Sequence, residues 1–232
     1  MNKLYWGKRK RINNSEEEQE EEPSKKAKSS PYNGLDDSSG ISTNNNHIYF
    51  YCSVNKKNCK KLNIALKNIA QEIMSEPRNF VDKDKYIYLH INSFGGSVFA
   101  CFSTIDTILS LPIPVVSIVE GAAASAGTLI SVACNYRIIH GTSFMLIHQL
   151  SSGTWGKMAD IEDEVENLQL LMKTIKDIYK KHTKLRGKQL DDILKRDMWW
   201  DADTCLEKGL VDEIRYTEDK MYEVDKNKIR LD

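Results

Sequence analysis

The spacing of apolar and polar residues changes repeatedly along the chain, and these changes predict strands followed by helices. Residues 57–75 carry apolar side chains three or four positions apart, which is the spacing of one helix face. Residues 86–91 and 115–119 are continuous apolar runs, as in parallel strands that are covered on both faces. Helical patterns follow these runs at residues 97–111 and 128–133. This order predicts an α/β fold with a mainly parallel sheet.

One long helix and several shorter elements are predicted for the rest of the chain. Residues 158–182 are apolar on one helical face and carry Leu170 and Met172 on the other. Because a small sheet cannot cover that much apolar surface, we expect this helix to pack against another subunit. Further strands are predicted at 48–52, 136–140, 143–148 and 210–215, and helices at 188–194 and 202–208, with Gly209 as a C-cap.

Residues 1–46 differ in composition from everything that follows. An acidic run, Glu16–Glu22, lies between the basic clusters Lys8–Arg11 and Lys25–Lys28, and a Ser/Asn/Gly/Asp stretch follows. Too little apolar surface is present to offset chain entropy, so we predict a disordered charged N-terminal tail and one domain over 47–232. The start of the chain has no secretory or organellar leader, which favours a cytoplasmic location, and the basic clusters leave a nuclear address as an alternative.

Composition excludes several classes of partner and site. The 33 basic and 33 acidic residues balance, so net charge gives no argument for a nucleic-acid or membrane partner. No apolar run is long enough to span a bilayer. The five cysteines are odd in number and lack paired CxxC spacing, so we expect reduced thiols in the core and neither a disulfide framework nor a metal site.

The stretch Gly121–Gly127 is the first candidate for chemistry. It places Ser125 between an apolar strand and a helix, where the first-turn amides are unpaired and small neighbours let a substrate backbone approach. A nucleophilic serine is one interpretation, and tight helix packing by Ala, Gly and Ser is the other.

An activated serine needs a histidine and an acid to orient it. His148 ends a predicted strand, where α/β folds place functional groups, and is the best placed of the five histidines. We expect His47 and His182 to be solvated and His90 to be structural. More than a dozen carboxylates follow His148, so local pattern does not choose the acid.

An α/β-hydrolase nucleophile elbow is a rival interpretation, since residues 123–127 approximate its G-x-S-x-G pattern. That fold requires the order serine, acid, histidine. The only histidine near the C-terminus is His182, on a helix with a polar face, so the order argues against it.

Four blocks in order over residues 48–214 resemble the proteolytic subunit of the Clp protease, a self-compartmentalised serine peptidase. Ile91–Gly96 resembles its I-N-S-P-G-G turn, and Gly121–Gly127 its G-x-x-A-S-x-G nucleophile turn. Met145–Gln149 resembles its M-I-H-Q-P block, and Arg196–Asp212 its R-D…A…E-Y-G-L-V-D block.

The resemblance implies a role for five residues. Ser125 matches the nucleophile, His148 the general base and Asp197 the residue that orients it. The backbone N–H groups of Gly96 and Ala126 match the oxyanion hole, whose donors stabilise the transition state.

The resemblance also implies a fold and an assembly. The fold is that shared by Clp proteases and crotonases, with repeated β-β-α units and a protruding handle helix, here residues 158–182. Two seven-membered rings of the chain stack through this helix and enclose the active sites. An ATP-dependent AAA+ unfoldase feeds in polypeptide substrates, so the chain itself uses no cofactor.

Several positions depart from the family pattern. Phe94 and Leu150 stand where the family has prolines, His90 stands where tyrosine is common, and Trp199–Trp200 is bulkier than usual. Three alternatives therefore accompany the endopeptidase interpretation: a catalytically silent ring subunit, a crotonase-type acyl-CoA enzyme, and a peptidase with a Ser–Lys dyad.

Overall fold

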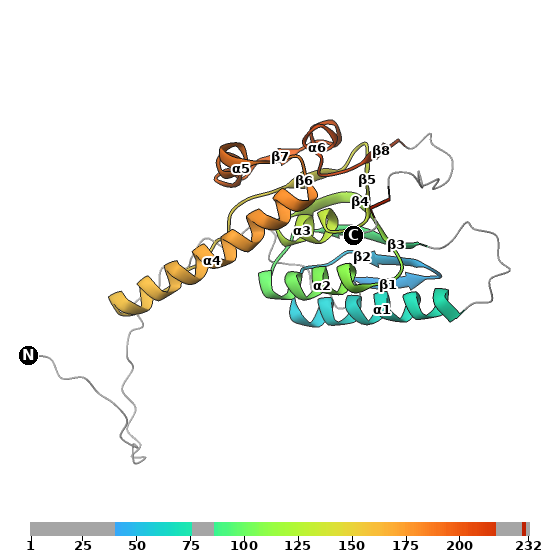
Figure 1. The fold of residues 1–232 in the computed structure, drawn as a ribbon, viewed down its shortest axis with the longest axis horizontal. Helices are drawn as coiled ribbons and strands as arrows, with labels where there is room; N and C mark the ends of the chain where they lie inside the picture. The colour runs from blue at the N-terminus through green and yellow to red at the C-terminus, as the bar shows by residue number, and fades with distance from the viewer. Residues whose placement is uncertain (1–39, 76–85, 217–228, 231–232) are drawn as a thin grey trace, which may run out of the picture. The chain divides into compact units, whose positions relative to one another are not determined.

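The computed structural model describes residues 40–75, 86–216 and 229–230, within a unit that spans 37–232 (Figure 1). Its strands form one sheet in the order β1–β2–β3–β4–β5–β8, with β6 paired to β4 and β7 paired to β6. The strands are β1 (Ile41–Asn44), β2 (His47–Phe50), β3 (Ile87–Ser93), β4 (Val115–Ala124), β5 (Tyr136–His140), β6 (Phe144–Leu146), β7 (Trp199–Trp200) and β8 (Glu213–Arg215). The helices are α1 (Lys56–Ser75), α2 (Val98–Ser110), α3 (Ala126–Val132), α4 (Met158–His182), α5 (Gly187–Leu194) and α6 (Ala202–Lys208).

The central strands bury side chains on both faces of the sheet. β2, β3, β4, β5 and β8 run parallel to one another. Odd-numbered residues of β3 and β4, such as Leu89 and Val119, join the main core with apolar residues of α1, α2 and α3. Even-numbered ones, such as Tyr88 and Ile118, belong to a smaller cluster on the other face. The predicted α/β fold with a mainly parallel sheet is confirmed.

β4 continues through part of the stretch that the sequence predicted as a turn. Its first half pairs with β5 through Val116–Val119, and its second half pairs with β6 through Ala122–Ala124. Alanine and glycine are poor strand formers, so the local sequence pattern predicts that the strand ends at Val119. In the structure, pairing with β6 extends the strand beyond that residue.

The described fold begins before the predicted domain boundary at residue 47. β1 pairs antiparallel with β2, and Ile41 is its only residue that is even half-buried. Because the rest of this edge strand is polar and exposed, it carries no hydrophobic pattern that would reveal it. The predicted tail up to residue 39, with its basic clusters, lies outside the described residues.

The prediction that His182 is solvated is wrong, because the residue is buried at the end of α4. Its carbonyl accepts a hydrogen bond from Arg137 Nη1 at 2.5 Å, and the same nitrogen donates to the carbonyl of Gly209 at 2.8 Å. Arg137 Nε and Nη2 donate to the two carboxylate oxygens of Asp212 at 2.9 and 2.7 Å. This buried arginine on β5 therefore connects the C-terminal ends of α4 and α6 to the sheet. Helical periodicity cannot reveal hydrogen bonds between residues so far apart in the sequence.

The prediction that His47 is solvated is only partly correct, because the residue is half-buried and hydrogen-bonded. Its Nδ1 lies 2.8 Å from Nε2 of His90, whose Nδ1 lies 2.8 Å from Oε1 of Glu120. Because a carboxylate only accepts, His90 Nδ1 carries a proton and donates to Glu120, and the opposite ring nitrogen shares a hydrogen bond with His47. Tyr51 donates its hydroxyl to the other carboxylate oxygen. His90 is therefore a buried, fully bonded residue, in the structural role that the sequence predicted.

These contacts change the pKa of the Glu120 carboxyl group. Burial by itself raises the pKa of this carboxyl group, but hydrogen bonds from His90 and Tyr51 and positive charge on His90 and His140 lower it. The net effect is a pKa below the usual value of 4.5. His140 contributes from 3.9 Å.

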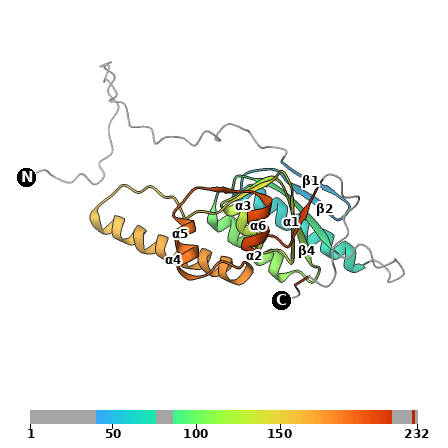
Figure 2. The same cartoon turned by 90° about the horizontal axis from the view of Figure 1, so that it is seen from above.

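α4 is the element that extends farthest from the sheet, as Figures 1 and 2 both show. Ile175 and Tyr179 in its last turns are buried in the main core. Val165 and Leu170, nearer its start, are 46% and 64% exposed. The predicted excess of apolar surface on this helix is therefore present. Within the described residues, no helix is both long enough and apolar enough to cross a membrane.

Replacing Glu120 with glutamine is expected to destabilise the fold in a pH-dependent way. Since the folded-state pKa is lowered, the carboxylate stabilises the fold above its unfolded pKa, and this contribution is lost as pH falls through the folded value. Urea unfolding near pH 7 should show Glu120→Gln less stable by about 1 kcal/mol, because a charged acceptor becomes neutral. The difference should shrink as the pH is lowered past about 4.5. A difference that stays constant over this range would contradict the role of the charge.

Candidate active site

The pairing of β4 with β6 brings the serine and the histidine to the same edge of the sheet. The parallel register places Ala124 opposite Leu146, and Ser125 N donates to the carbonyl of Leu146 at 2.8 Å. Ser125 directly follows Ala124, and His148 follows Leu146 by two residues. Both side chains line one small pocket.

The pairing of β6 with β7 brings the acid to the histidine. The antiparallel register places Leu146 opposite Trp199, so two further residues along each strand set His148 opposite Asp197. His148 Nδ1 lies 2.9 Å from Asp197 Oδ1. Since the carboxylate accepts, Nδ1 carries the proton and Nε2 keeps a free lone pair, which is the form that acts as a base.

The His148–Asp197 pair is open to solvent. The Asp197 side chain is 79% exposed and that of His148 is 27% exposed. Such an exposed hydrogen-bonded pair adds little to the free energy of unfolding, because water competes with it. Its effect is to fix the orientation and tautomer of the imidazole.

Ser125 has a backbone conformation that side chains rarely adopt. Its φ of 54° and ψ of −120° lie in a region that favours glycine, at the point where β4 ends and α3 begins. Within the described residues its hydroxyl makes no hydrogen bond and does not cap α3. The hydroxyl and the histidine thus share a pocket without a closed hydrogen bond, as is common in enzymes without substrate.

The turn between β3 and α2 lies against the serine and requires two glycines. Gly95 has φ +92°, and a Cβ there would lie 2.8 Å from Ser125 Cβ and 2.6 Å from the carbonyl oxygen of Ala124. Gly96 has φ +145°, and a Cβ there would lie 2.3 Å from the carbonyl oxygen of Val54. In the described part of the chain, the N–H groups of Gly96 and Ala126 have no acceptor. Two donors are therefore free beside the serine hydroxyl.

The wall of the Ser125 pocket is largely apolar. Three helices contribute to it, α2, α3 and α4, together with the segment after His148. Sequence periodicity identified several of these residues only as core positions of helices, and no local signal marks them as part of a site. The apolar wall consists of Val98, Leu129, Leu150, Ile175 and Tyr179.

The cysteines do not compete with Ser125 as nucleophiles. All five are free thiols buried in the core, as predicted. Burial raises the pKa of Cys134 and of Cys205 to about 12. Cys101, whose Sγ donates to the carbonyl of Ala126 at 3.3 Å, has a pKa raised further by burial. No cluster of three or more metal-binding side chains is present among the described residues.

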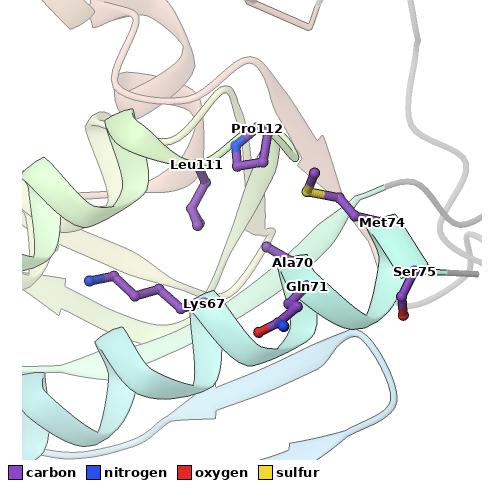
Figure 3. A pocket seen from close by; sticks show the side chains of 7 residues that line it. All are labelled: Lys67, Ala70, Gln71, Met74, Ser75, Leu111 and Pro112. Carbon is purple, nitrogen blue, oxygen red and sulfur yellow. The ribbon is translucent and has the colours of Figure 1, made fainter.

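A second cavity lies between α1 and the residues that follow α2, and Figure 3 shows its lining. Leu111 and Pro112 form one side, and α1 contributes Ala70 and Met74 with polar Lys67, Gln71 and Ser75. Its lining contains no histidine, cysteine or carboxylate, and its one lysine, Lys67, lies about 12 Å from Ser75 along α1, too far to act as the base of that hydroxyl.

Two of the departures from the family pattern contact each other. The rings of Phe94 and Trp199 lie edge to face, with centroids 6.0 Å apart and planes at 89°. Phe94 belongs to the glycine turn that packs against Ser125, and Trp199 belongs to β7, so this contact joins that turn to the strand that pairs with β6. The sequence flagged both residues, but their contact depends on the β6–β7 register.

Comparison with known proteins identifies the family of the chain. A family model described as Clp protease matches residues 56–218, which include Ser125, His148 and Asp197. The ATP-dependent Clp protease proteolytic subunit of Streptococcus mutans is 36% identical over 156 residues. That alignment covers 66% of this chain and 78% of the bacterial protein.

The backbone of Ser125 predicts an unusual response to substitution. Ser125→Gly should be more stable than Ser125→Ala by about 1 kcal/mol, because glycine adopts a φ of 54° without strain. This gain exceeds the conformational entropy that glycine loses on folding. Thermal and urea unfolding of both variants would measure it. Equal stabilities, or a less stable Ser125→Gly, would show that the site stores no backbone strain.

Proposed function

Because the chain belongs to the Clp protease family, as a proteolytic subunit and serine peptidase, we propose that Ser125 is its nucleophile and His148 its general base. Asp197 orients the base. The observation that carries this proposal is the 2.9 Å contact between His148 Nδ1 and Asp197, which directs the basic Nε2 away from the acid. An acyl-CoA enzyme of the crotonase type would not need this histidine–acid pair beside a serine.

The first half of the reaction forms an acyl-enzyme. His148 Nε2 takes the proton of the Ser125 hydroxyl as Oγ bonds to the carbonyl carbon of the scissile peptide. The carbonyl oxygen becomes an oxyanion and accepts hydrogen bonds from the N–H groups of Gly96 and Ala126, whose donors are unoccupied. The imidazolium then gives its proton to the leaving amine as the C–N bond breaks.

The second half of the reaction releases the acyl group. Water attacks the ester carbonyl, and His148 Nε2 takes one of its protons. The same two N–H groups stabilise the second oxyanion. Collapse of the intermediate breaks the bond to Oγ and returns the proton to Ser125. No step uses a metal or nucleotide on this chain, and ATP hydrolysis belongs to a separate partner.

The side chain that precedes the scissile bond would bind against the apolar wall beside Ser125. This wall of Val98, Leu129, Leu150, Ile175 and Tyr179 presents no charge to that side chain. We therefore expect polypeptide substrates to be cleaved after apolar residues. Burial of such a side chain supplies binding energy that a charged one would lose.

The family implies oligomeric rings and an AAA+ partner in general. For this chain, we propose two stacked seven-membered rings that dock through α4, because apolar side chains on that helix are exposed. An AAA+ unfoldase would deliver unfolded polypeptides to the enclosed sites. The domain over 47–232 would form the ring. A cytoplasmic location, with a nuclear one as the alternative, stays a prediction, as does the role of residues 1–46.

Substitution of the three proposed catalytic residues should lower peptide hydrolysis by unequal amounts. Ser125→Ala and His148→Ala should each lower kcat/KM by on the order of 10⁴-fold or more, because either one removes the nucleophilic step. The loss of kcat/KM in Asp197→Ala should be about 100-fold smaller than in the other two variants, because this substitution removes only the orientation of the base. Initial rates with a fluorogenic peptide that has an apolar residue before the scissile bond would measure these effects.

Asp203→Ala is the matched control, because Asp203 is another exposed aspartate and lies outside the pocket. It should keep wild-type kcat/KM. A His148→Ala variant that retains full activity would favour a Ser–Lys dyad. A wild-type protein that forms rings and hydrolyses no peptide would favour a catalytically silent subunit.

Charged substitutions on α4 should separate the proposed rings. Val165→Asp combined with Leu170→Glu places two carboxylates on the exposed apolar surface, so burying it between rings becomes unfavourable. Sedimentation velocity should show a particle of about half the wild-type mass. Asp177→Asn, on the part of α4 near its own core, should leave the particle unchanged. A double substitution that keeps both mass and melting temperature would contradict docking through this helix.

A further inference from the structure

The aromatic pair beside the active site is only partly covered. Phe94 is 50% exposed and Trp199 is 40% exposed, although each ring contacts the other. Edge-to-face contact fixes the relative orientation of the rings and leaves a surface of each open to solvent. Large aromatic side chains that stay this exposed next to a reaction centre offer an apolar surface to a bound substrate.

Along the chain, Phe94 lies on the opposite side of the proposed oxyanion donor from the pocket residue Val98. Gly96 supplies one oxyanion donor, and Val98, two residues later, lines the apolar pocket. Phe94 lies two residues before Gly96 and is not part of that pocket. Along this segment, the pocket and the aromatic pair are therefore separated by the donor itself.

The segment that carries His148 has the same order. Leu150, two residues after His148, lines the apolar pocket. Leu146, two residues before it, is the register partner of Trp199. Both segments that border the serine thus have the pocket on their downstream side and the aromatic pair on their upstream side.

An extended peptide bound at Ser125 places the residues on either side of its scissile bond in opposite directions. If the residue before the bond occupies the apolar pocket, the residue after it faces the aromatic pair. On the premise that Ser125 is the nucleophile, we propose that Phe94 and Trp199 form a subsite for an aromatic or large apolar side chain directly after the scissile bond. Phe94 stands where the turn pattern that this segment resembles has proline, which lacks this ring.

A series of internally quenched peptides tests the subsite. The peptides are identical except for Phe, Leu, Ala or Asp at the residue after the scissile bond, and mass spectrometry verifies the bond that is cut. The wild-type protein should cleave the Phe peptide with a kcat/KM about tenfold higher than the Ala peptide, and the Asp peptide more slowly still.

Variants connect this preference to the two rings. Phe94→Ala and Trp199→Ala should each reduce the Phe-to-Ala preference to about twofold, while kcat/KM for the Ala peptide stays within a few-fold of wild type. Trp199→Phe retains an aromatic ring and should restore most of the preference. Phe99→Ala is the matched control, because Phe99 is an exposed phenylalanine outside the pair and should leave the preference intact.

A separate measurement distinguishes failure of the subsite from failure of the proposed function. A small fluorophosphonate has no residue after a scissile bond, so both alanine variants should label at Ser125 at the wild-type rate. A wild-type protein that does not label would overturn the premise. A protein that labels and cleaves without preferring Phe would overturn the subsite alone. Variants that slow the Phe and Ala peptides equally would also overturn it, because the rings would then only support the turn.

Discussion

The shared pairing of β6 with β4 and β7 is the constraint on which the site depends. All three residues of β6 pair with β4 in parallel on one side, and two of them, Met145 and Leu146, pair antiparallel with β7 on the other. The first register sets Ser125 beside the strand that leads to His148, and the second sets His148 opposite Asp197. A shift of one residue in either ladder would turn alternate side chains away from the site. The proposed nucleophile, base and acid are therefore aligned by backbone hydrogen bonds.

The glycine turn completes the site through close packing. Gly95 and Gly96 leave no room for a Cβ because the backbone of Ala124 and Val54 lies so near. This close packing places the free N–H of Gly96 in the pocket that Ser125 lines. The helices then close the pocket, and α4 contributes its buried end while its exposed end stays available for assembly. One helix thus links the substrate pocket to the proposed contact between rings.

Sequence alone predicted most of the fold and part of the site. Helix α4 was predicted with the bounds that the structure shows, because its periodicity is long and its ends are clear. β1 and β7 were missed because one is polar and the other has two residues, so neither carries a pattern. Asp197 was named only through resemblance, since no local feature separates it from other carboxylates. Its place follows from the β6–β7 register, and the burial of His182 follows from Arg137, both of which are long-range contacts.

The most direct test of the account is the site of covalent attachment of a fluorophosphonate to the assembled protein, located by peptide mapping. The account predicts one adduct per chain, on Ser125, because this serine shares its pocket with a histidine and with two N–H groups that have no acceptor among the described residues. An adduct on another serine, or none on a protein that still assembles, would contradict the claim that the strand registers build a working nucleophile.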